Sequence, residues 1–190
     1  RLFKKKEHPT RFKEKFGFYT KKKIKGKLVW FHGASVGEIL SIIPLVEKLE
    51  KNKKIKQILV TSNTLSSSKI LLNYRLKKTI HQFFPIDTNY HTQKFLNYWK
   101  PSNAIFIDSE IWPNMITNIK KSSISLILIN ARITSKSLKK WKIFSSYAQN
   151  FFQKFDLCLS SNLKSKKYLK ILGARKIKYI GNLKFAESEK

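Results

Sequence analysis

The feature that most constrains the fold is a regular alternation between short apolar runs and longer helical segments, which begins at residue 28. The short runs are rich in β-branched residues and apolar on both faces, which is typical of strands in a parallel sheet. This alternation predicts an α/β fold, a Rossmann-like parallel sheet with helices on both faces. The expected strands are 28–32, 57–62, 80–84, 104–108, 125–130, 157–160 and 176–180. The expected helices lie near 36–51, 65–78, 88–99, 112–121, 135–154 and 162–172.

Residues at the ends of these helices support the assignment. Thr64, Asp87 and Ser135 are predicted to cap the second, third and fifth helices. Pro113 fits the first turn of the fourth helix, where a missing N–H costs nothing. Gly173 fits the position that follows the last helix, where a left-handed backbone is common.

The chain is strongly basic, with 40 lysines and arginines against 11 acidic residues and a net charge of +29. Such a charge suggests nucleic acid as a partner. However, most of these cations are lysines, whereas bidentate contacts to phosphate and guanine favour arginine. The lysines are also spread along the whole chain among many Ile, Asn, Phe and Ser residues, a mixture that an AT-rich genome produces without selection for binding. We therefore expect no nucleic acid partner, and a basic α/β nucleic-acid-binding domain stays as an alternative.

The first 27 residues combine lysines with aromatic side chains. A segment of this kind suits an anionic membrane surface, with lysines near the headgroups and rings at the interface. A solvated helix that packs a few rings onto the domain explains the same pattern equally well. No stretch of the chain reaches the ~18 apolar residues that a membrane-spanning helix needs. The rings concerned are Phe3, Phe12, Phe16, Phe18 and Tyr19.

Thiol and imidazole groups give no sign of a metal site. Cys158 is the only cysteine and lies between two leucines, which predicts a buried structural thiol. The four histidines show no ligand spacing. We expect neither a metal nor a cofactor.

The first candidate site follows the first expected strand, in the stretch from His32 to Glu38. Ligands of such folds bind beyond the carboxyl ends of the strands, and the next helix offers unpaired N–H groups there. The stretch is neither a dinucleotide fingerprint nor a Walker loop, and Ser35 is not in a nucleophile elbow. Ser35 and Glu38 have the spacing of a capping box, which is the simpler interpretation. A carboxylate at this edge also suits a general base.

Two further polar clusters follow later strands. One runs from Asp108 to Asn114 and contains Glu110, and the other contains Asn130 and Arg132. Helix capping near Pro113 explains the first of these about as well as ligand binding does. An anion or sugar site formed from three strand ends is nevertheless more economical than three unrelated caps.

Together these segments resemble the Kdo (3-deoxy-D-manno-octulosonic acid) transferase family. The resemblance covers nearly the whole chain in collinear order, and the S-V-G-E and E-I-W-P-N motifs are specific when they occur together. The matching stretches are 11–17, 32–38, 61–64, 84–87, 110–114, 129–132 with Ser137, 172–174 and 181–185.

The resemblance implies the N-terminal half of a GT-B glycosyltransferase, in which two Rossmann-like domains face each other across a cleft. The implied reaction transfers Kdo from CMP-Kdo to a lipid A precursor (lipid IVA) in lipopolysaccharide biosynthesis, with inversion and without a metal. Glu38 matches the catalytic base. The residues expected to bind the acceptor are Ser35, Gly37, Glu110, Asn130 and Arg132.

The same resemblance implies a domain organisation. Residues 1–27 form a basic membrane-proximal segment, 28–181 the Rossmann-like acceptor-binding domain, and 182–190 the start of an interdomain hinge. The C-terminal domain that binds CMP-Kdo lies outside the chain, so the fragment is expected to be inactive alone. The expected partners are the anionic lipid A precursor and a membrane surface. The expected location is the inner membrane, either peripheral on the cytoplasmic face or anchored by a segment before Arg1.

Besides a nucleic-acid-binding domain, the second alternative to a Kdo transferase is a GT-B enzyme with another lipid acceptor.

The expected position of Glu38 has two opposing consequences for its proposed role. A helix N-terminus lowers the pKa of a nearby carboxyl group, whereas a general base works best with a pKa nearer the working pH.

Overall fold

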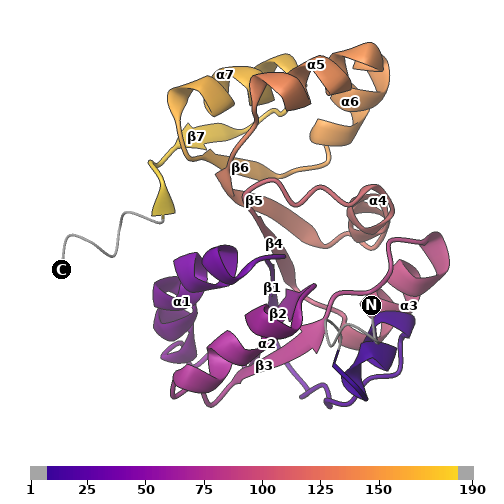
Figure 1. The fold of residues 1–190 in the computed structure, drawn as a ribbon, viewed down its shortest axis with the longest axis vertical. Coiled ribbons are helices and arrows are strands. Elements are labelled where there is room, and N and C mark those ends of the chain that lie inside the picture. The colour runs from indigo at the N-terminus through magenta and orange to yellow at the C-terminus, as the bar shows by residue number, and fades with distance from the viewer. Residues whose placement is uncertain (1–7, 184–190) are drawn as a thin grey trace.

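The computed structural model describes residues 8–183, and its strands form one sheet in the order β3-β2-β1-β4-β5-β6-β7 (Figure 1). All neighbouring strands run parallel. The chain moves outward from β1 to β3 and then returns to pair β4 with β1, so the strand order reverses between β1 and β4. The strands are β1 (Leu28–His32), β2 (Gln57–Ser62), β3 (Thr79–Phe83), β4 (Asn103–Ile107), β5 (Ser125–Ala131), β6 (Leu157–Ser160) and β7 (Ile177–Tyr179).

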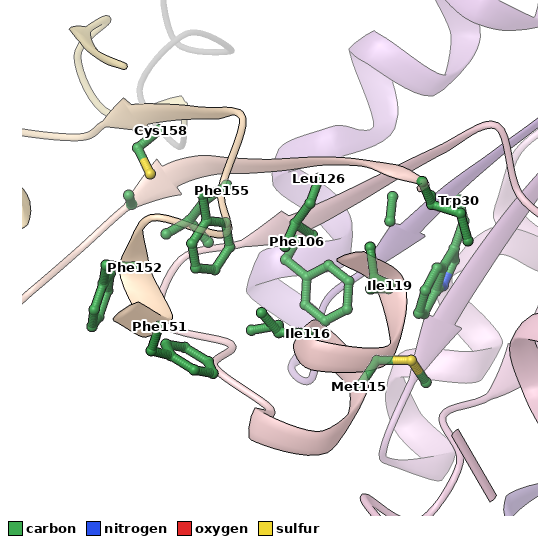
Figure 2. Packing of buried hydrophobic residues seen from close by; sticks show 14 of the residues in the cluster. Trp30, Phe106, Met115, Ile116, Ile119, Leu126, Phe151, Phe152, Phe155 and Cys158 are labelled. Atoms are coloured by element: carbon green, nitrogen blue, oxygen red, sulfur yellow. The ribbon is translucent and has the colours of Figure 1, made fainter. Parts of the chain in front are cut away.

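Helices cover both faces of this sheet, as expected (Figure 1). Successive strand residues point to opposite faces: Leu28 and Trp30 join the core beneath α3, α4, α6 and α7, whereas Val29 and Phe31 join the core beneath α1. Figure 2 shows the first of these cores. The helices are η1 (Arg11–Phe16), α1 (Val36–Glu50), α2 (Leu65–Ile70), η2 (Leu71–Asn73), α3 (Asn89–Trp99), α4 (Pro113–Lys121), α5 (Ser135–Ile143), α6 (Ser145–Phe152) and α7 (Leu163–Ile171).

The expected helix over 65–78 is wrong in its second half. The helix ends at Ile70, a short 3₁₀ turn follows, and Tyr74 is extended (φ −119°, ψ 143°). The carboxylate of Glu50, at the end of α1, accepts hydrogen bonds from the backbone N–H groups of Lys77 and Lys78. It also accepts one from the Thr79 hydroxyl at 2.7 Å. These hydrogen bonds hold residues 77–79 against the end of α1, so the chain continues into β3 instead of extending the helix.

The expected helix over 135–154 is two helices. Phe144 leaves the helical conformation (φ −119°, ψ 61°) and separates α5 from α6. The break allows the ring of Trp141 to stack on Phe151, with centroids 5.5 Å apart, and to meet Phe152 edge-on.

Several helix ends agree with the sequence and two do not. Thr64 caps α2, Pro113 starts α4, and Gly173 follows α7 with φ +98°. The caps of α3 and α5 are Thr88 and Thr134, one residue away from the expected Asp87 and Ser135. Asp87 instead accepts hydrogen bonds from the backbone N–H groups of Asn114 and Met115, and so it caps the fourth helix.

The described part of the first 27 residues packs onto the domain. Tyr19 stacks on Tyr98 and meets Trp99, and Gln57 exchanges hydrogen bonds with the backbone of Lys22 and Ile24. Contact of this segment with a membrane stays a prediction. Residues 1–7 lie outside the described residues, as does the expected hinge from residue 184 onward.

Cys158 is fully buried in the core, as expected of a structural thiol (Figure 2). Burial raises the pKa of its thiol to about 12. The group is therefore a protonated, apolar component of the core at neutral pH.

Candidate functional site

The candidate site lies at the carboxyl ends of β1 and β4, where the strand order reverses. In open α/β sheets this reversal leaves a crevice in which ligands bind. Three segments meet at this edge: the loop from β1 into α1, the loop from β4 into α4, and the end of β5.

The loop after β1 caps α1 in a variant of the capping box, in which Glu38 reaches the N–H of Ala34, the residue before the N-cap. Ser35 is the N-cap of α1, and its hydroxyl accepts a hydrogen bond from the Glu38 N–H. In return, Oε1 of Glu38 accepts from the Ser35 hydroxyl at 2.8 Å, and Oε2 accepts from the Ala34 N–H at 2.9 Å. The simpler interpretation of this motif is therefore confirmed, and the capping bonds fix the carboxylate in place.

The surroundings of Glu38 oppose its ionisation. Burial raises the pKa of its carboxyl group, and the negative charges of Glu110 and Asp108 raise it further. The hydrogen bonds from Ser35 and Ala34 act in the opposite direction but are outweighed. The pKa of Glu38 is raised overall, against the direction expected from the helix N-terminus alone, because burial and two nearby acids dominate.

Close packing leaves no side-chain space at Gly33. A Cβ at this position would lie 3.0 Å from Cβ of Glu38 and 3.1 Å from Cδ1 of Ile107. These contacts are tighter than nine in ten real Cβ contacts, so a larger residue would require its neighbours to shift by a few tenths of an ångström. Glycine allows the loop and the Glu38 side chain to pack over β4 without that shift.

Beneath these acids, His32 is fully buried at the end of β1. Its ring stacks on Phe84 with centroids 3.8 Å apart, and its Nδ1 lies 3.0 Å from the Thr61 hydroxyl. Its Nε2 lies 3.3 Å from Oε2 of Glu110. Burial lowers the pKa of His32, against the opposing effect of Glu110, so the ring is neutral at physiological pH.

A neutral ring carries a single proton, and acceptor oxygens face both of its nitrogens. The Thr61 carbonyl lies 3.2 Å from Nδ1, and the Thr61 hydroxyl donates its own proton to the Phe31 carbonyl. The Glu110 carboxylate lies 3.3 Å from Nε2. One tautomer therefore donates to the Thr61 carbonyl and the other to Glu110.

Glu110 is held in its ionised form. Burial alone would raise its pKa, but the contact with His32 and the hydrogen bond from Nε1 of Trp112, at 2.8 Å, lower it overall. The site thus pairs a stable carboxylate, Glu110, with a second carboxylate, Glu38, that takes up a proton more readily. This is the arrangement in which one acid tunes its neighbour for proton transfer.

Two strand ends in the site adopt the left-handed conformation. Asp108 (φ +60°) follows β4, and Asn130 (φ +52°) lies near the end of β5. Non-glycine residues adopt this conformation uncommonly, and such positions cluster at functional sites. Oδ1 of Asn130 accepts a hydrogen bond from the Leu183 N–H, which ties the segment after β7 to this edge.

The structure brings Ser35, Glu38 and Glu110 together as the sequence predicts, and places Gly37 in the first turn of α1. Arg132 is exposed beside them, and its N–H lies 3.4 Å from the Asp108 carbonyl. Roles for these residues in binding an acceptor stay predictions. Sequence analysis missed His32. The available signal was a histidine that ends an apolar strand just before a small-residue loop.

Residues 8–183 contain neither a cluster of metal ligands nor a membrane-spanning helix. No group of three or more His, Cys, Asp or Glu side chains in this part of the chain is arranged to hold a metal ion. None of the helices there is long and apolar enough to cross a membrane.

Comparison with protein families gives a match over residues 10–187 to the model described as 3-deoxy-D-manno-octulosonic-acid transferase (kdotransferase). A protein of that name from Rickettsia bellii is 36% identical over 189 residues, which are 100% of this chain and 45% of the relative. A probable mitochondrial one from Arabidopsis thaliana is 37% identical over 71% of this chain and 30% of its own length. One from Haemophilus influenzae is 25% identical over 92% of this chain and 42% of its own length. The chain thus spans less than half of these relatives.

Solved structures share the fold at low identity. UDP-GlcNAc 2-epimerase from Neisseria meningitidis, bound to UDP-GlcNAc, has a TM-score of 0.59 at 14% identity, over 84% of this chain and 47% of that one. S. aureus MnaA in a co-structure with UDP has a TM-score of 0.61 at 16% identity, over 83% and 45%. At this identity the likeness concerns the fold alone, and it confirms the Rossmann-like α/β architecture.

Proposed function

The chain belongs to the 3-deoxy-D-manno-octulosonic-acid transferase family, and from this premise we propose that it is the acceptor-binding half of an enzyme that transfers Kdo from CMP-Kdo to a lipid A precursor, lipid IVA. The observation that carries the proposal is the half-buried Glu38 at the reversal of strand order, with a raised pKa beside the ionised Glu110. A carboxylate of this kind is suited to remove a proton from a hydroxyl group.

In the proposed reaction, Glu38 takes the proton of the acceptor hydroxyl while that oxygen attacks the anomeric carbon of Kdo. The bond from this carbon to the phosphate of CMP breaks, CMP leaves with the bonding electrons, and the configuration inverts. Ser35 and the Ala34 N–H hold the carboxylate in position. Glu110 stays ionised and increases the basicity of Glu38. Residues that bind CMP-Kdo belong to a C-terminal domain in this proposal.

The charge of the chain supports an anionic acceptor at a membrane surface. Its +29 net charge favours a phosphorylated glycolipid and an acidic leaflet. The exposed rings Phe18 and Phe16, next to the lysine-rich segment 21–27, are suited to interfacial contact. We therefore place the enzyme at the inner membrane, either peripheral on the cytoplasmic face or anchored by a segment before Arg1.

The test is a transfer assay with CMP-Kdo and lipid IVA, on this chain joined to the C-terminal part of the Rickettsia bellii relative. Glu38→Gln should fold normally and lower the transfer rate by a factor of about 10²–10⁴, the usual contribution of a general base. Glu47→Gln, an exposed acid on the same helix, is the matched control and should transfer like the wild type.

Equal transfer by Glu38→Gln and the wild type would reduce Glu38 to a helix cap and overturn the proposed mechanism. A folded chimera that transfers nothing, under conditions in which the intact R. bellii protein is active, would overturn the proposed acceptor for this chain.

A further inference from the structure

The corner between α5 and α6 exposes apolar side chains that the proposed reaction does not use. The side chains of Ile143, Phe144 and Tyr147 are 73%, 69% and 52% exposed, and α5 buries none of its residues. An isolated exposed apolar residue needs no explanation, but neighbouring ones at a single corner mark an interaction surface. The corner lies at the end of the sheet that carries β5 to β7, away from η1 and β3 (Figure 1).

This corner is built on a packed support. Trp141 stacks on Tyr147 with an interplanar angle of 9° and on Phe151 with one of 20°. Phe151 is buried in the core, which fixes α6 on the sheet (Figure 2). The helix break at Phe144 therefore presents the two outermost side chains, Ile143 and Phe144, on a rigid base.

The charge around the corner has a single sign. Four lysines of α5 are exposed, and no acidic residue occurs between Glu110 and Asp156 in the sequence. Basic side chains flanking exposed apolar ones are typical of helices that lie in a membrane interface. The lysines are Lys136, Lys139, Lys140 and Lys142.

We propose that this corner docks on an anionic lipid bilayer, with Ile143 and Phe144 entering the interface and the α5 lysines contacting the headgroups. The inference goes beyond the proposed function, which assigns membrane contact to residues 1–27. An anionic bilayer satisfies both features of the surface at once, because it offers negative charge outside and an apolar layer beneath. Duplex nucleic acid would match the lysines and leave the aliphatic and aromatic tip in water.

The location of the corner connects it to the candidate site. Helix α5 begins just after Arg132, at the edge of the sheet that carries Glu38 and Glu110. With a rise of 1.5 Å per residue, its nine residues span roughly 13 Å. A bilayer contact at Phe144 would thus hold that edge within about one helix length of the lipid surface.

The experiment measures co-sedimentation of the 190-residue chain with phosphatidylcholine vesicles that contain or lack phosphatidylglycerol. The double variant Ile143→Ser, Phe144→Ser should lower the partition coefficient on phosphatidylglycerol vesicles by about tenfold. Lys139→Gln and Lys140→Gln should each lower it by about fivefold, with the loss disappearing at high salt. Leu72→Ser is the matched control, because Leu72 is 82% exposed and lies in η2, outside the α5–α6 corner. This variant should leave the partition coefficient unchanged.

Quenching of tryptophan fluorescence by brominated lipids tests whether the α5–α6 corner is the part of the chain that contacts the bilayer. Trp30 and Trp99 are fully buried, whereas Trp112 and Trp141 are partly exposed. Brominated lipids should therefore quench the fluorescence of Trp141, and this quenching should be lost in Trp141→Phe and retained in Trp112→Phe. Phe18→Ser tests the competing contribution of the N-terminal segment. If Phe18→Ser abolishes sedimentation while the double variant binds normally, the proposal fails.

Other outcomes also overturn it. Equal binding by the wild type and the double variant would do so, as would tighter binding to duplex DNA than to anionic vesicles. Self-association that the double variant removes, without any vesicle binding, would show that the corner contacts a second copy. Vesicle binding is measured without sugar transfer, so a failed transfer assay would overturn the proposed function and leave this inference standing.

Discussion

Two glutamates of this molecule, Glu14 and Glu38, have carboxylates in opposite surroundings. Glu14 of η1 is fully buried and accepts hydrogen bonds from Arg11 at 2.8 and 3.1 Å, from the Phe83 N–H at 2.9 Å, and from the Thr20 hydroxyl. Glu38 is half-buried, receives two hydrogen bonds, and lies near two other acids.

The comparison separates a structural acid, Glu14, from Glu38, the acid that we propose as the general base. The donors around Glu14 come from η1, from Thr20 and from β3, so its carboxyl group ties the N-terminal segment to the edge strand of the sheet. Arg11 also donates to the carbonyl of His81 on β3, and His81 itself stays neutral because burial first, and the Arg11 and Lys21 charges next, lower its pKa to about 3. The hydrogen bonds of Glu14 thus have a structural role. Glu38, with fewer donors and with negatively charged neighbours, has a raised pKa.

The largest expected effect on stability belongs to the structural acid. Glu14→Ala leaves Arg11 and the Phe83 N–H without their acceptor, so the free energy of unfolding should fall by about 3–5 kcal/mol. The melting temperature should fall by roughly 10 °C. Glu38→Ala, the matched change, should cost about 1 kcal/mol, as the loss of a helix cap does. Calorimetry of Glu14→Ala and Glu38→Ala measures both losses of stability. Equal losses would contradict the distinction between the two glutamates.

A smaller effect on stability is expected at His32, which links Glu110 to Phe84 of the core. His32→Phe retains the ring but removes the partner of Glu110 and Thr61, which should cost about 1–3 kcal/mol in the free energy of unfolding. It should also raise the pKa of Glu110, as followed by ¹³C NMR of its carboxyl group. His91→Phe, on the surface of α3, is the control. An unchanged Glu110 titration in His32→Phe would show that Trp112 alone holds the carboxylate ionised.

The smallest expected effect concerns Glu38 and Glu110, whose contributions to the free energy of unfolding should depend on pH in opposite ways. Glu38 has a raised pKa in the folded state, so it binds its proton more tightly there than in the unfolded chain. From about pH 4.3 upward, through the folded pKa, the wild type should therefore lose stability relative to Glu38→Gln. Glu110 has a lowered pKa in the folded state. The wild type should therefore lose stability relative to Glu110→Gln as the pH falls from about 4.3 through the folded pKa of Glu110.

Urea unfolding of the three proteins across this pH range measures both slopes. Slopes of the same sign for the two variants would contradict the assignment of opposite pKa shifts to Glu38 and Glu110.

Sequence analysis predicted the layers of the fold because the information is local. Apolar runs such as 28–32 and 57–62 bury both faces of a strand, and the alternation with helices leaves a parallel sheet as the economical arrangement. The capping box of Ser35 and Glu38 is equally local, since its members lie within one helical turn.

Errors occurred where distant segments decided the outcome. The helix expected at 65–78 ends early because Glu50 of α1 binds the backbone at Lys77 and Lys78. Asp87 caps α4 rather than the helix that follows it in sequence. In both cases a carboxylate found its donors across the tertiary structure, and no residue spacing in the chain signals such a contact.

The residues of the chain indicate the family, the parallel α/β sheet and the edge of the sheet at which Glu38, Glu110 and Arg132 follow their strands. No pattern in the chain predicts the donors that surround Glu14, the position of His32 against Glu110, or the raised pKa of Glu38. A motif specifies which groups are present, whereas a pKa depends on burial and on charges a few ångströms away. Those neighbours come from strands far apart in the chain, and folding alone brings them together.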